Sequence, residues 1–303
     1  MRLHSPKTRA FLLVRDHVDS SVTRFLRERK FVLVPTPVLS PSTDDAPHFT
    51  INYYGTKALL GTSSQFYTEA GLMAFPRVFS MAPAFRREPV NRSTPLHFTE
   101  FGYLHLEIAN ANCAEVMNTI EDLLATVVED CNSQVAAELK LLGRRISPPR
   151  RPFRQIKFDS VYPGVRNEKE FSEISHDATM KFSHNLTEPV WIVNWPASVK
   201  DEIYYKRDAQ NKDIAMCFDL IYPEGFGEGS SGGERETDYQ TLLSKSDLRT
   251  MTRCQWYLQM FKLGLTPHSG CGIGLERMFS WVSGQRNLKR ILPFYRDQFN
   301  IAP

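Results

Sequence analysis

The segment 219–235, DLIYPEGFGEGSSGGER, places carboxylates, glycines and an arginine close together in the chain. Asp219 and Glu228 could hold a cation or an ammonium group, and Arg235 could bind a carboxylate or a phosphate through its planar guanidinium. Glycines let a backbone approach a ligand closely. The segment therefore indicates a site for a small zwitterion and a metal nucleotide, and a flexible surface hairpin is the alternative interpretation.

Three further segments carry groups that suit phosphate or carboxylate binding. The first, RKFVLVPTPVLSP, surrounds Pro37, the second, FRREPVNRSTPLHFTEF, spans 85–101, and the third, GCGIGLERM, spans 270–278. The third is not a P-loop, because no Gly-Lys-Ser/Thr follows its glycines. Each segment alone also has an ordinary structural interpretation, such as a surface ion pair or the start of a helix.

In this order, the three segments resemble the signature motifs of class II aminoacyl-tRNA synthetases, most closely those of the aspartyl/asparaginyl branch. The stretches SSQFYTEAGLMAFPRVFSMAPAFRRE and LTPHSGCGIGLERMFSWVSG extend the likeness. The resemblance covers nearly the whole chain, from about residue 6 to Pro303. It implies an α+β fold in which helices flank an antiparallel sheet, within one catalytic domain that spans 1–303.

The resemblance also implies an ATP-dependent, AMP-forming ligase that adenylates an amino acid. Arg86 would contact the α-phosphate and the oxygen that becomes charged during attack, which stabilises the transition state electrostatically. Phe101 would stack on one face of adenine, and Arg277 would cover the other face and meet the γ-phosphate. Glu88 would accept a hydrogen bond from the adenine amino group.

Other residues complete the nucleotide and metal sites that the resemblance implies. His97 would lie near the terminal phosphates, and Gly272 and Gly274 would line the nucleotide site before a helix begins. Magnesium is the expected metal, because it prefers oxygen ligands and bridges the phosphates of ATP. Its expected protein ligands are Asp219, Glu228 and Ser231.

The amino-acid end of the expected site departs from its relatives at two positions. Gln65 would seat the α-ammonium or carboxylate group of the substrate, and Arg235 would bind an oxygen of its side chain. Thr68 stands where aspartyl-specific relatives usually have lysine, which argues against an aspartyl-tRNA synthetase. His105 stands where an acidic residue is usual, which argues against an ordinary asparaginyl enzyme.

His105 is expected to select aspartate over asparagine, together with Arg235. A histidine can donate a hydrogen bond to a carboxylate, and it does so more strongly when protonated. The alternative is that His105 points to the far face of the sheet as a core histidine.

The first motif begins almost at Met1, so we expect no N-terminal OB-fold that would read an anticodon. Bare cores of this branch include AMP-forming asparagine synthetases. The leading hypothesis is therefore a ligase that adenylates aspartate, or a close analogue, and transfers it to ammonia or a small amine. Ammonia would come from solution, because Arg2 stands where a glutaminase would need cysteine. No stable tRNA binding is expected.

Three alternative functions remain open. The first is tRNA aminoacylation of the asparaginyl/aspartyl type. The second is a natural-product amide ligase that uses a metabolite amine as its acceptor. The third is a non-catalytic paralogue that binds an amino acid or a nucleotide, although a retained cluster of charged groups would be costly without a ligand.

Composition places the chain among globular proteins. Of its 303 residues, 42% are hydrophobic and 12% aromatic, so a disordered or fibrous chain is excluded. The net charge of +3 is too small to indicate a nucleic-acid partner by itself. The five cysteines form no C-x-x-C pair, which argues against a zinc site. We expect a cytoplasmic protein without a membrane span, and a homodimer formed around Phe31–Val34.

The expected elements place these motifs on a sheet with helices around it. Strands at 77–88 and 97–108 would form a hairpin that carries the second motif. Other strands are predicted at 31–40, 190–195, 202–206 and 214–222, with a hairpin at 48–55. Helical spacing of apolar residues predicts helices at 6–29, 112–143 and 246–264, and a shorter one begins near Ser63 or Ser64. The segment GRRISPPRRPFR is predicted to be a basic, proline-rich connector.

Overall fold

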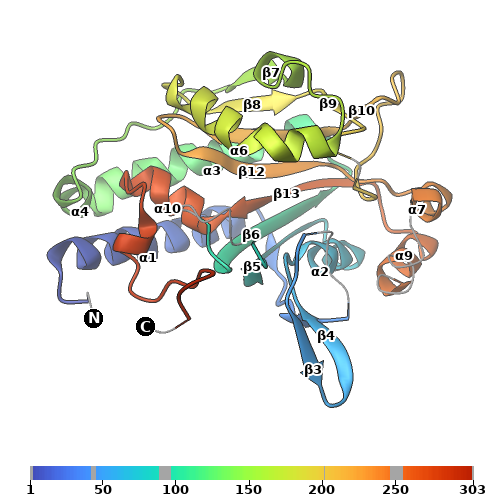
Figure 1. The fold of residues 1–303 in the computed structure, drawn as a ribbon, viewed down its shortest axis with the longest axis horizontal. Helices are drawn as coiled ribbons and strands as arrows, with labels where there is room; N and C mark the ends of the chain where they lie inside the picture. Colours follow the sequence, from blue (N-terminus) through green and yellow to red (C-terminus); the bar gives the residue numbers. More distant parts are fainter. Residues whose placement is uncertain (1–2, 42–45, 89–96, 201, 246–254, 302–303) are drawn as a thin grey trace.

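The computed structural model describes residues 3–41, 46–88, 97–200, 202–245 and 255–301. Its centre is an eight-stranded sheet with the strand order β1-β5-β6-β13-β12-β11-β8-β7 (Figure 1). The strands are β1 Val32–Leu33, β5 Arg77–Phe85, β6 Glu100–Ala109, β13 His268–Gly274, β12 Gly227–Glu234, β11 Cys217–Tyr222, β8 Val190–Val193 and β7 Arg154–Lys157. Neighbours from β5 to β8 are antiparallel, and the edge strands β1 and β7 pair in parallel. The predicted α+β class is confirmed, with a sheet that is mixed at its edges.

The hairpin predicted for the second motif forms from β5 and β6. Its register pairs Arg77 with Ile108 and Phe85 with Glu100. Because side chains alternate along a strand, Leu104 and Leu106 enter the main core while His105, between them, faces the other side. The hairpin therefore separates a packed core from a face that can carry polar groups.

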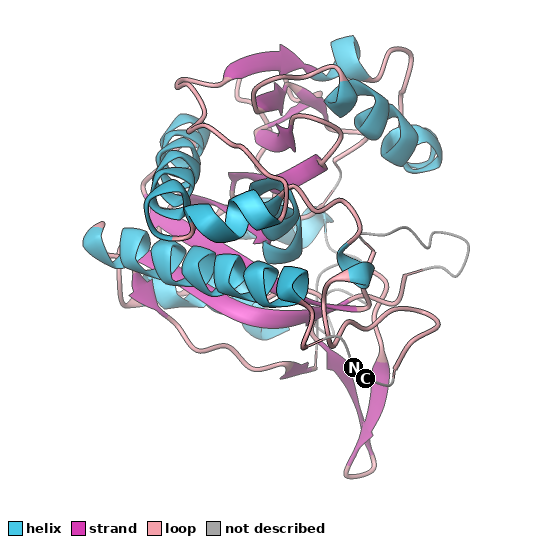
Figure 2. Cartoon of the chain, turned by 90° about the vertical axis from the view of Figure 1, so that its left-hand side faces the viewer, coloured by secondary structure: helices cyan, strands magenta, loops and turns pink. Residues whose placement is uncertain are grey.

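Helices α1 Pro6–Glu28, α3 Cys113–Gln134, α4 Ala136–Leu141 and α10 Leu275–Ser283 cover the core side of the sheet. In α1, buried apolar residues such as Phe11, Val14 and Val18 recur every three or four positions, so one stripe of the helix faces the core. Figure 2 shows these long helices stacked against the sheet. The helix predicted at 6–29 is confirmed.

The helix predicted at 112–143 is two helices. The first, α3, begins at a capping box in which Asn112 and Glu115 satisfy each other's backbone N–H groups. Val135, with φ −129° and ψ 32°, leaves the helical conformation, and α4 follows it. A single change of backbone angle therefore ended the regular helix that the apolar spacing predicted.

Several elements on the opposite side of the sheet were not predicted. The helix α6 Glu168–His184 packs against β11 and β12, and α5 Phe158–Val161 lies beside it. Both close a second core around Phe158, Tyr162 and Trp195. Strands β12 and β13 were missed because their glycine-rich sequences have low strand propensity.

The remaining elements surround the sheet. They are β2 Leu39–Ser40, β3 Thr50–Tyr53, β4 Thr56–Leu60, α2 Gln65–Ala70, η1 Gly71–Met73, β9 Trp195–Pro196, β10 Ile214–Ala215, α7 Tyr239–Lys245, α9 Gln255–Lys262 and η3 Leu288–Arg290. Strands β2, β4 and β3 form a separate small sheet that projects from the body (Figure 1). The helix α2 starts after Ser64, as predicted.

Three predicted elements need correction. The strand expected at 31–40 divides into β1 and β2, which belong to different sheets. The segment 202–206 is a turn whose only bridge joins Tyr205 to Arg235 among the described residues. Of the helix predicted at 246–264, residues 246–254 lie outside the described residues, and α9 forms in the rest. Over the described ranges, we find no helix that is both long and apolar enough to cross a membrane.

Candidate active site

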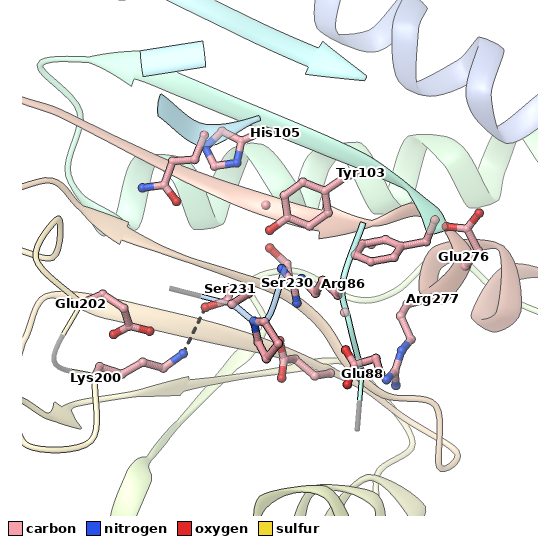
Figure 3. A pocket seen from close by; sticks show the side chains of 18 of the residues that line it. Arg86, Glu88, Tyr103, His105, Lys200, Glu202, Ser230, Ser231, Glu276 and Arg277 are labelled. Carbon is pink, nitrogen blue, oxygen red and sulfur yellow. Dashed lines mark hydrogen bonds between the residues drawn. The ribbon is translucent and has the colours of Figure 1, made fainter. Parts of the chain in front are cut away.

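A cavity of ≈ 850 Å³ opens on the face of the sheet opposite α1 and α3, and Figure 3 shows it from close by. Residues of α2, α6, β6, β12, β13 and α10 line it. Every site residue predicted from the sequence lines this cavity except Asp219, which is buried beside it. The fold therefore gathers into one place residues that lie up to 212 positions apart, from Gln65 to Arg277.

One end of the cavity carries two guanidinium groups. Arg86 follows β5, and its guanidinium lies 5.4 Å from the centre of the Phe101 ring. Arg277 lies in the first turn of α10, where burial lowers its pKa although Glu228 and Glu88 oppose that shift. Two partly buried arginines at one end of a cavity would attract an anionic ligand such as a phosphate.

The residues expected to bind magnesium lie on two paired strands. Asp219 on β11 is directly opposite Ser231 on β12. Burial raises the pKa of Glu228, and the neighbouring Asp219 raises it further. No group of three or more His, Cys, Asp and Glu side chains able to hold a metal is found within the described part of the chain. This donor set fits Mg²⁺, which uses one or two carboxylates and completes its coordination with water and phosphate oxygens.

Lys200 is a residue of this region that sequence reasoning missed. Its Nζ lies 3.2 Å from Asp219 Oδ1 and 3.2 Å from Ser231 Oγ, and 4.5 Å from the centre of the Trp195 ring. Burial is the largest effect and by itself would lower the pKa of Lys200, but the charge of Asp219 and smaller contributions from Tyr205, Glu202 and Cys217 together raise that pKa well above its usual value. The ammonium group therefore stays charged. Lys200 lies in a loop without a motif, so no local signal pointed to it.

The other end of the cavity is built around a buried pair of opposite charges. Arg235 Nη2 donates to Glu107 Oε1 at 2.6 Å, and its Nε lies 3.1 Å from the same oxygen. His105 Nε2 lies 2.8 Å from Glu107 Oε1. Burial alone would raise the pKa of Glu107, but the charge of Arg235 and the hydrogen bond from His105 hold it at about 2. Glu107 is therefore an anion that orients both neighbours.

Glu69 is a second buried carboxylate close to Arg235, and several side chains share hydrogen bonds with it. Gln65 Nε2 and Tyr257 Oη each donate to its carboxylate at 2.8 Å, and His268 Nε2 lies 3.2 Å from it. Burial is the largest effect and by itself would lower the pKa of His268, but its hydrogen bond to Glu69 and the charges of Glu69 and Glu107 together raise it. Sequence reasoning assigned a role to Gln65 and missed Glu69, Tyr257 and His268, although Glu69 and His268 lie inside the quoted stretches.

Two glycines of β13 make room for the polar groups of β6. A Cβ atom at Gly272 would lie 1.8 Å from the hydroxyl oxygen of Tyr103, and one at Gly270 would lie 2.1 Å from Cδ of Glu107. Close approach of neighbouring side chains thus requires glycine at both positions. The predicted residues Gly272 and Gly274 both line the cavity, and the helix that follows them begins at Leu275.

This sheet and this cavity are those of the catalytic core of a class II aminoacyl-tRNA synthetase. The family described as tRNA synthetases class II (D, K and N) matches residues 1–298, and the chain belongs to it. Asparagine–tRNA ligase of Koribacter versatilis is 30% identical over 319 residues, and that of Streptococcus mutans 32% over 320 residues. Each alignment covers 99% of this chain and 71% of the relative. Like these relatives, the protein is an ATP-dependent ligase that adenylates an amino acid.

A solved structure extends the likeness to three dimensions. The crystal structure of asparaginyl-tRNA synthetase from Pyrococcus horikoshii complexed with asparaginyl-adenylate superimposes with a TM-score of 0.89 at 26% identity. The superposition covers 99% of this chain and 71% of that chain. The fold and the family inferred from the three motifs are confirmed.

The comparisons contradict one expectation about partners. We expected no stable tRNA binding, but the relatives that match 99% of this chain are tRNA ligases. They also support the tRNA-aminoacylation alternative better than the leading hypothesis of aspartate transfer to ammonia. The net charge misled us because it averages over the whole surface and reports nothing about a local binding face.

Proposed function

We propose that the protein activates an amino acid of the aspartate/asparagine type with ATP and transfers it to tRNA. One observation carries this proposal: a single cavity has Arg86 and Arg277 at one end and the Arg235–Glu107 pair at the other. The first end suits a triphosphate, and the second suits a short polar side chain. We take tRNA as the acceptor because the relatives are named as tRNA ligases.

In the first step, a carboxylate oxygen of the amino acid attacks the α-phosphorus of ATP, and the bond from that phosphorus to pyrophosphate breaks. Arg86 would stabilise the charge that develops on the α-phosphate oxygens. Phe101 and Arg277 would hold adenine between them, with Glu88 accepting from its amino group. His97, which also lines the cavity, would lie near the departing pyrophosphate.

Asp219, Glu228 and Ser231 would hold Mg²⁺, and the bound ion would neutralise the charge of the ATP phosphates. Lys200, which contacts Asp219 and Ser231, would keep Asp219 ionised and would orient both side chains. In the second step, a terminal hydroxyl of tRNA attacks the carbonyl carbon of the adenylate, and AMP leaves with the bonding electrons.

The test combines two measurements on the purified protein. Exchange of labelled pyrophosphate into ATP should depend on asparagine or aspartate and on Mg²⁺, and total tRNA should accept the same amino acid from ATP. A control with Arg277→Ala should show neither activity. Exchange without any charged tRNA, together with an amide product formed from ammonia, would overturn the proposed acceptor.

We also propose that the protein is a homodimer. Leu33 and Leu39, which lie within the first motif on either side of Pro37, leave 40% and 42% of their surface exposed. Apolar side chains that remain exposed beside an edge strand suit a contact with a second copy.

A further inference from the structure

The first turn of α10 carries a buried carboxylate, Glu276, that lies between the cavity of the candidate site and a second cavity. Glu276 is 7% exposed and lines both the cavity of ≈ 850 Å³ and the second one of ≈ 470 Å³, to which α1 and residues 292–296 also contribute. Figure 3 shows Glu276 and Arg277 projecting from the same end of α10 in different directions. Two consecutive residues of one helix turn therefore face different surroundings.

Glu276 binds strand β6 at the point where the pairing of β6 with β13 ends. The last pair of that ladder joins Gly274 to Tyr103. Gly102, the preceding residue of β6, donates its backbone N–H to Glu276 Oε2 at 2.8 Å. Backbone N–H groups inside a protein need an acceptor, and this side chain supplies one just beyond the ladder.

The hydrogen bond connects the two groups that would cover adenine. Phe101 is next to Gly102 in the chain, and Arg277 is next to Glu276, so one bond joins the neighbours of both. A Cβ atom at Gly102 would lie 3.1 Å from Cδ1 of Leu275, which shows how closely the strand and the helix approach here. The separation between the Phe101 ring and the Arg277 guanidinium therefore depends on this contact.

Charged groups of α1 lie beside the same carboxylate. Arg15 Nη2 is 3.7 Å from Glu276 Oε1, and Arg15 Nε is 4.0 Å from Asp19 Oδ2. Burial is the largest effect and raises the pKa of Glu276 to about 7, with a smaller rise from Asp19, while Arg15 and the N–H of Gly102 oppose it. The other titratable or charged groups that line the two cavities near Glu276 are Arg86 and Glu88 after β5, Glu100 and Tyr103 on β6, Arg277 on α10, and Tyr295 and Arg296 near the C-terminus.

We propose that Glu276 is a positioning residue for adenine, whose carboxylate holds β6 and α10 at the separation at which Phe101 and Arg277 cover both faces of the ring. This inference rests on the proposed function and adds a residue to the nucleotide end of the same site. An ionised carboxylate accepts a hydrogen bond roughly twice as strongly as a neutral one. Nucleotide affinity should therefore rise as the pH increases through about 7, where Glu276 loses its proton.

The experiment measures the dissociation constant of a non-hydrolysable ATP analogue with Mg²⁺ by calorimetry, between about pH 6 and about pH 8.5. Wild-type protein should bind the analogue about three- to tenfold more tightly at the upper pH, which corresponds to the worth of one hydrogen bond. Glu276→Gln keeps an acceptor for Gly102 and stays neutral at every pH. It should bind as wild-type protein does at the lower pH, without the change. The titration of the nucleotide itself is common to both proteins and cancels in the comparison.

Pyrophosphate exchange gives a second measurement. Glu276→Gln should raise the KM for ATP and leave the KM for the amino acid unchanged, because its contact lies at the nucleotide end of the cavity. A residue that served stability alone would not separate these two constants. Thermal unfolding of the variant shows whether it is folded.

Two changes on α1 test whether the titrating group is Glu276. Asp19→Asn removes a negative charge near Glu276, so the midpoint of the pH dependence should move to lower pH. Arg15→Gln removes a positive charge, so the midpoint should move to higher pH. Both side chains line the second cavity. These opposite shifts decide the question even if Glu276→Gln does not fold.

Three results would overturn the inference. They are a wild-type affinity that does not change with pH, a Glu276→Gln protein that keeps the wild-type pH dependence, and midpoints that neither change on α1 moves. Loss of the dependence in Asp19→Asn alone would assign the titration to Asp19 instead. A folded wild-type protein that binds no nucleotide would refute the proposed function itself, and that outcome is distinct from the others.

Discussion

Arg86 and Arg277 place fixed positive charge at the end of the cavity where we expect the phosphates. Neither guanidinium loses its charge at neutral pH, even though burial lowers the pKa of Arg277. A lysine in the same position would present a single ammonium group instead of a planar fork. Arginine therefore suits a ligand with several anionic oxygens better than lysine does.

Replacement of Arg86 by alanine should slow adenylate formation about a hundred- to a thousandfold, because one donor to a developing anion is lost. Pyrophosphate exchange under saturating ATP measures this loss, and thermal unfolding checks that the fold persists. Arg86→Lys should recover part of the rate. Near-normal exchange in folded Arg86→Ala would contradict the role that we assign to this residue.

Glu107 should give the protein a stability that depends on pH. Its pKa is lowered from 4.5 to about 2 in the folded protein, so the folded state binds this proton less readily than the unfolded chain does. The stabilisation is complete above the unfolded pKa and is lost as the pH falls toward 2. At about pH 3, wild-type protein should have lost roughly 2 kcal/mol of this contribution.

Urea unfolding of wild-type protein and Glu107→Gln at about pH 7 and about pH 3 measures that contribution. The difference in unfolding free energy between the two proteins should shrink by about this amount at the lower pH. Glu236→Gln, which changes a carboxylate outside the cavity, serves as the control. An unchanged difference would show that Glu107 does not carry the low pKa.

At the scale of elements, β6 and β13 are paired so closely that side chains on one strand need glycine on the other. Gly272 lies opposite His105 in the register, and Gly270 lies opposite Glu107. The paired strands thus hold the polar residues of β6 against the flat glycine backbone of β13. A rigid strand pair of this kind can position a binding site more accurately than a loop can.

Gly272→Ala should destabilise the protein by about 1–3 kcal/mol, because a Cβ atom would overlap the Tyr103 hydroxyl. Exchange activity should fall as well, since Tyr103 would have to move within the cavity. Gly274→Ala is the control on the same strand, where the nearest atom to a new Cβ is 3.5 Å away. Equal losses in the two variants would contradict this explanation.

At the scale of the whole molecule, exposed apolar residues gather near the first motif. Leu33 and Leu39 belong to β1 and β2, and Met73 and Phe75 lie at and after η1, with exposures between 40% and 52%. Strand β1 is also an edge of the large sheet. An edge strand with apolar neighbours suits pairing with a second copy.

Light scattering at micromolar concentration should give twice the chain mass of 34.8 kDa. The double substitution Leu33→Glu and Leu39→Glu should shift the protein to the monomer, because it would bury charge in the contact. Leu263→Glu, at a position that is 74% exposed in another part of the molecule, should leave the mass unchanged. A monomeric wild-type protein would exclude the proposed dimer.

Much of the fold was predictable because local patterns coincide with local structure. The apolar stripe of 6–29 became α1, and the strand predicted at 97–108 became β6. Strands β12 and β13 escaped prediction, because glycine gives no strand signal and their need for glycine comes from the side chains packed across them. The boundary at Val135 likewise depended on one backbone angle and not on the apolar spacing.

The sequence by itself indicated the motif residues that line the cavity, because the motifs carry arginine, carboxylate and glycine in a recognisable order, but it gave no sign of Lys200. Only the tertiary structure decided how these groups are paired. Lys200 contacts Asp219, Glu69 meets His268, and Glu107 takes the N–H of His105. Such contacts join residues of different elements, and their chemistry depends on which atom faces which.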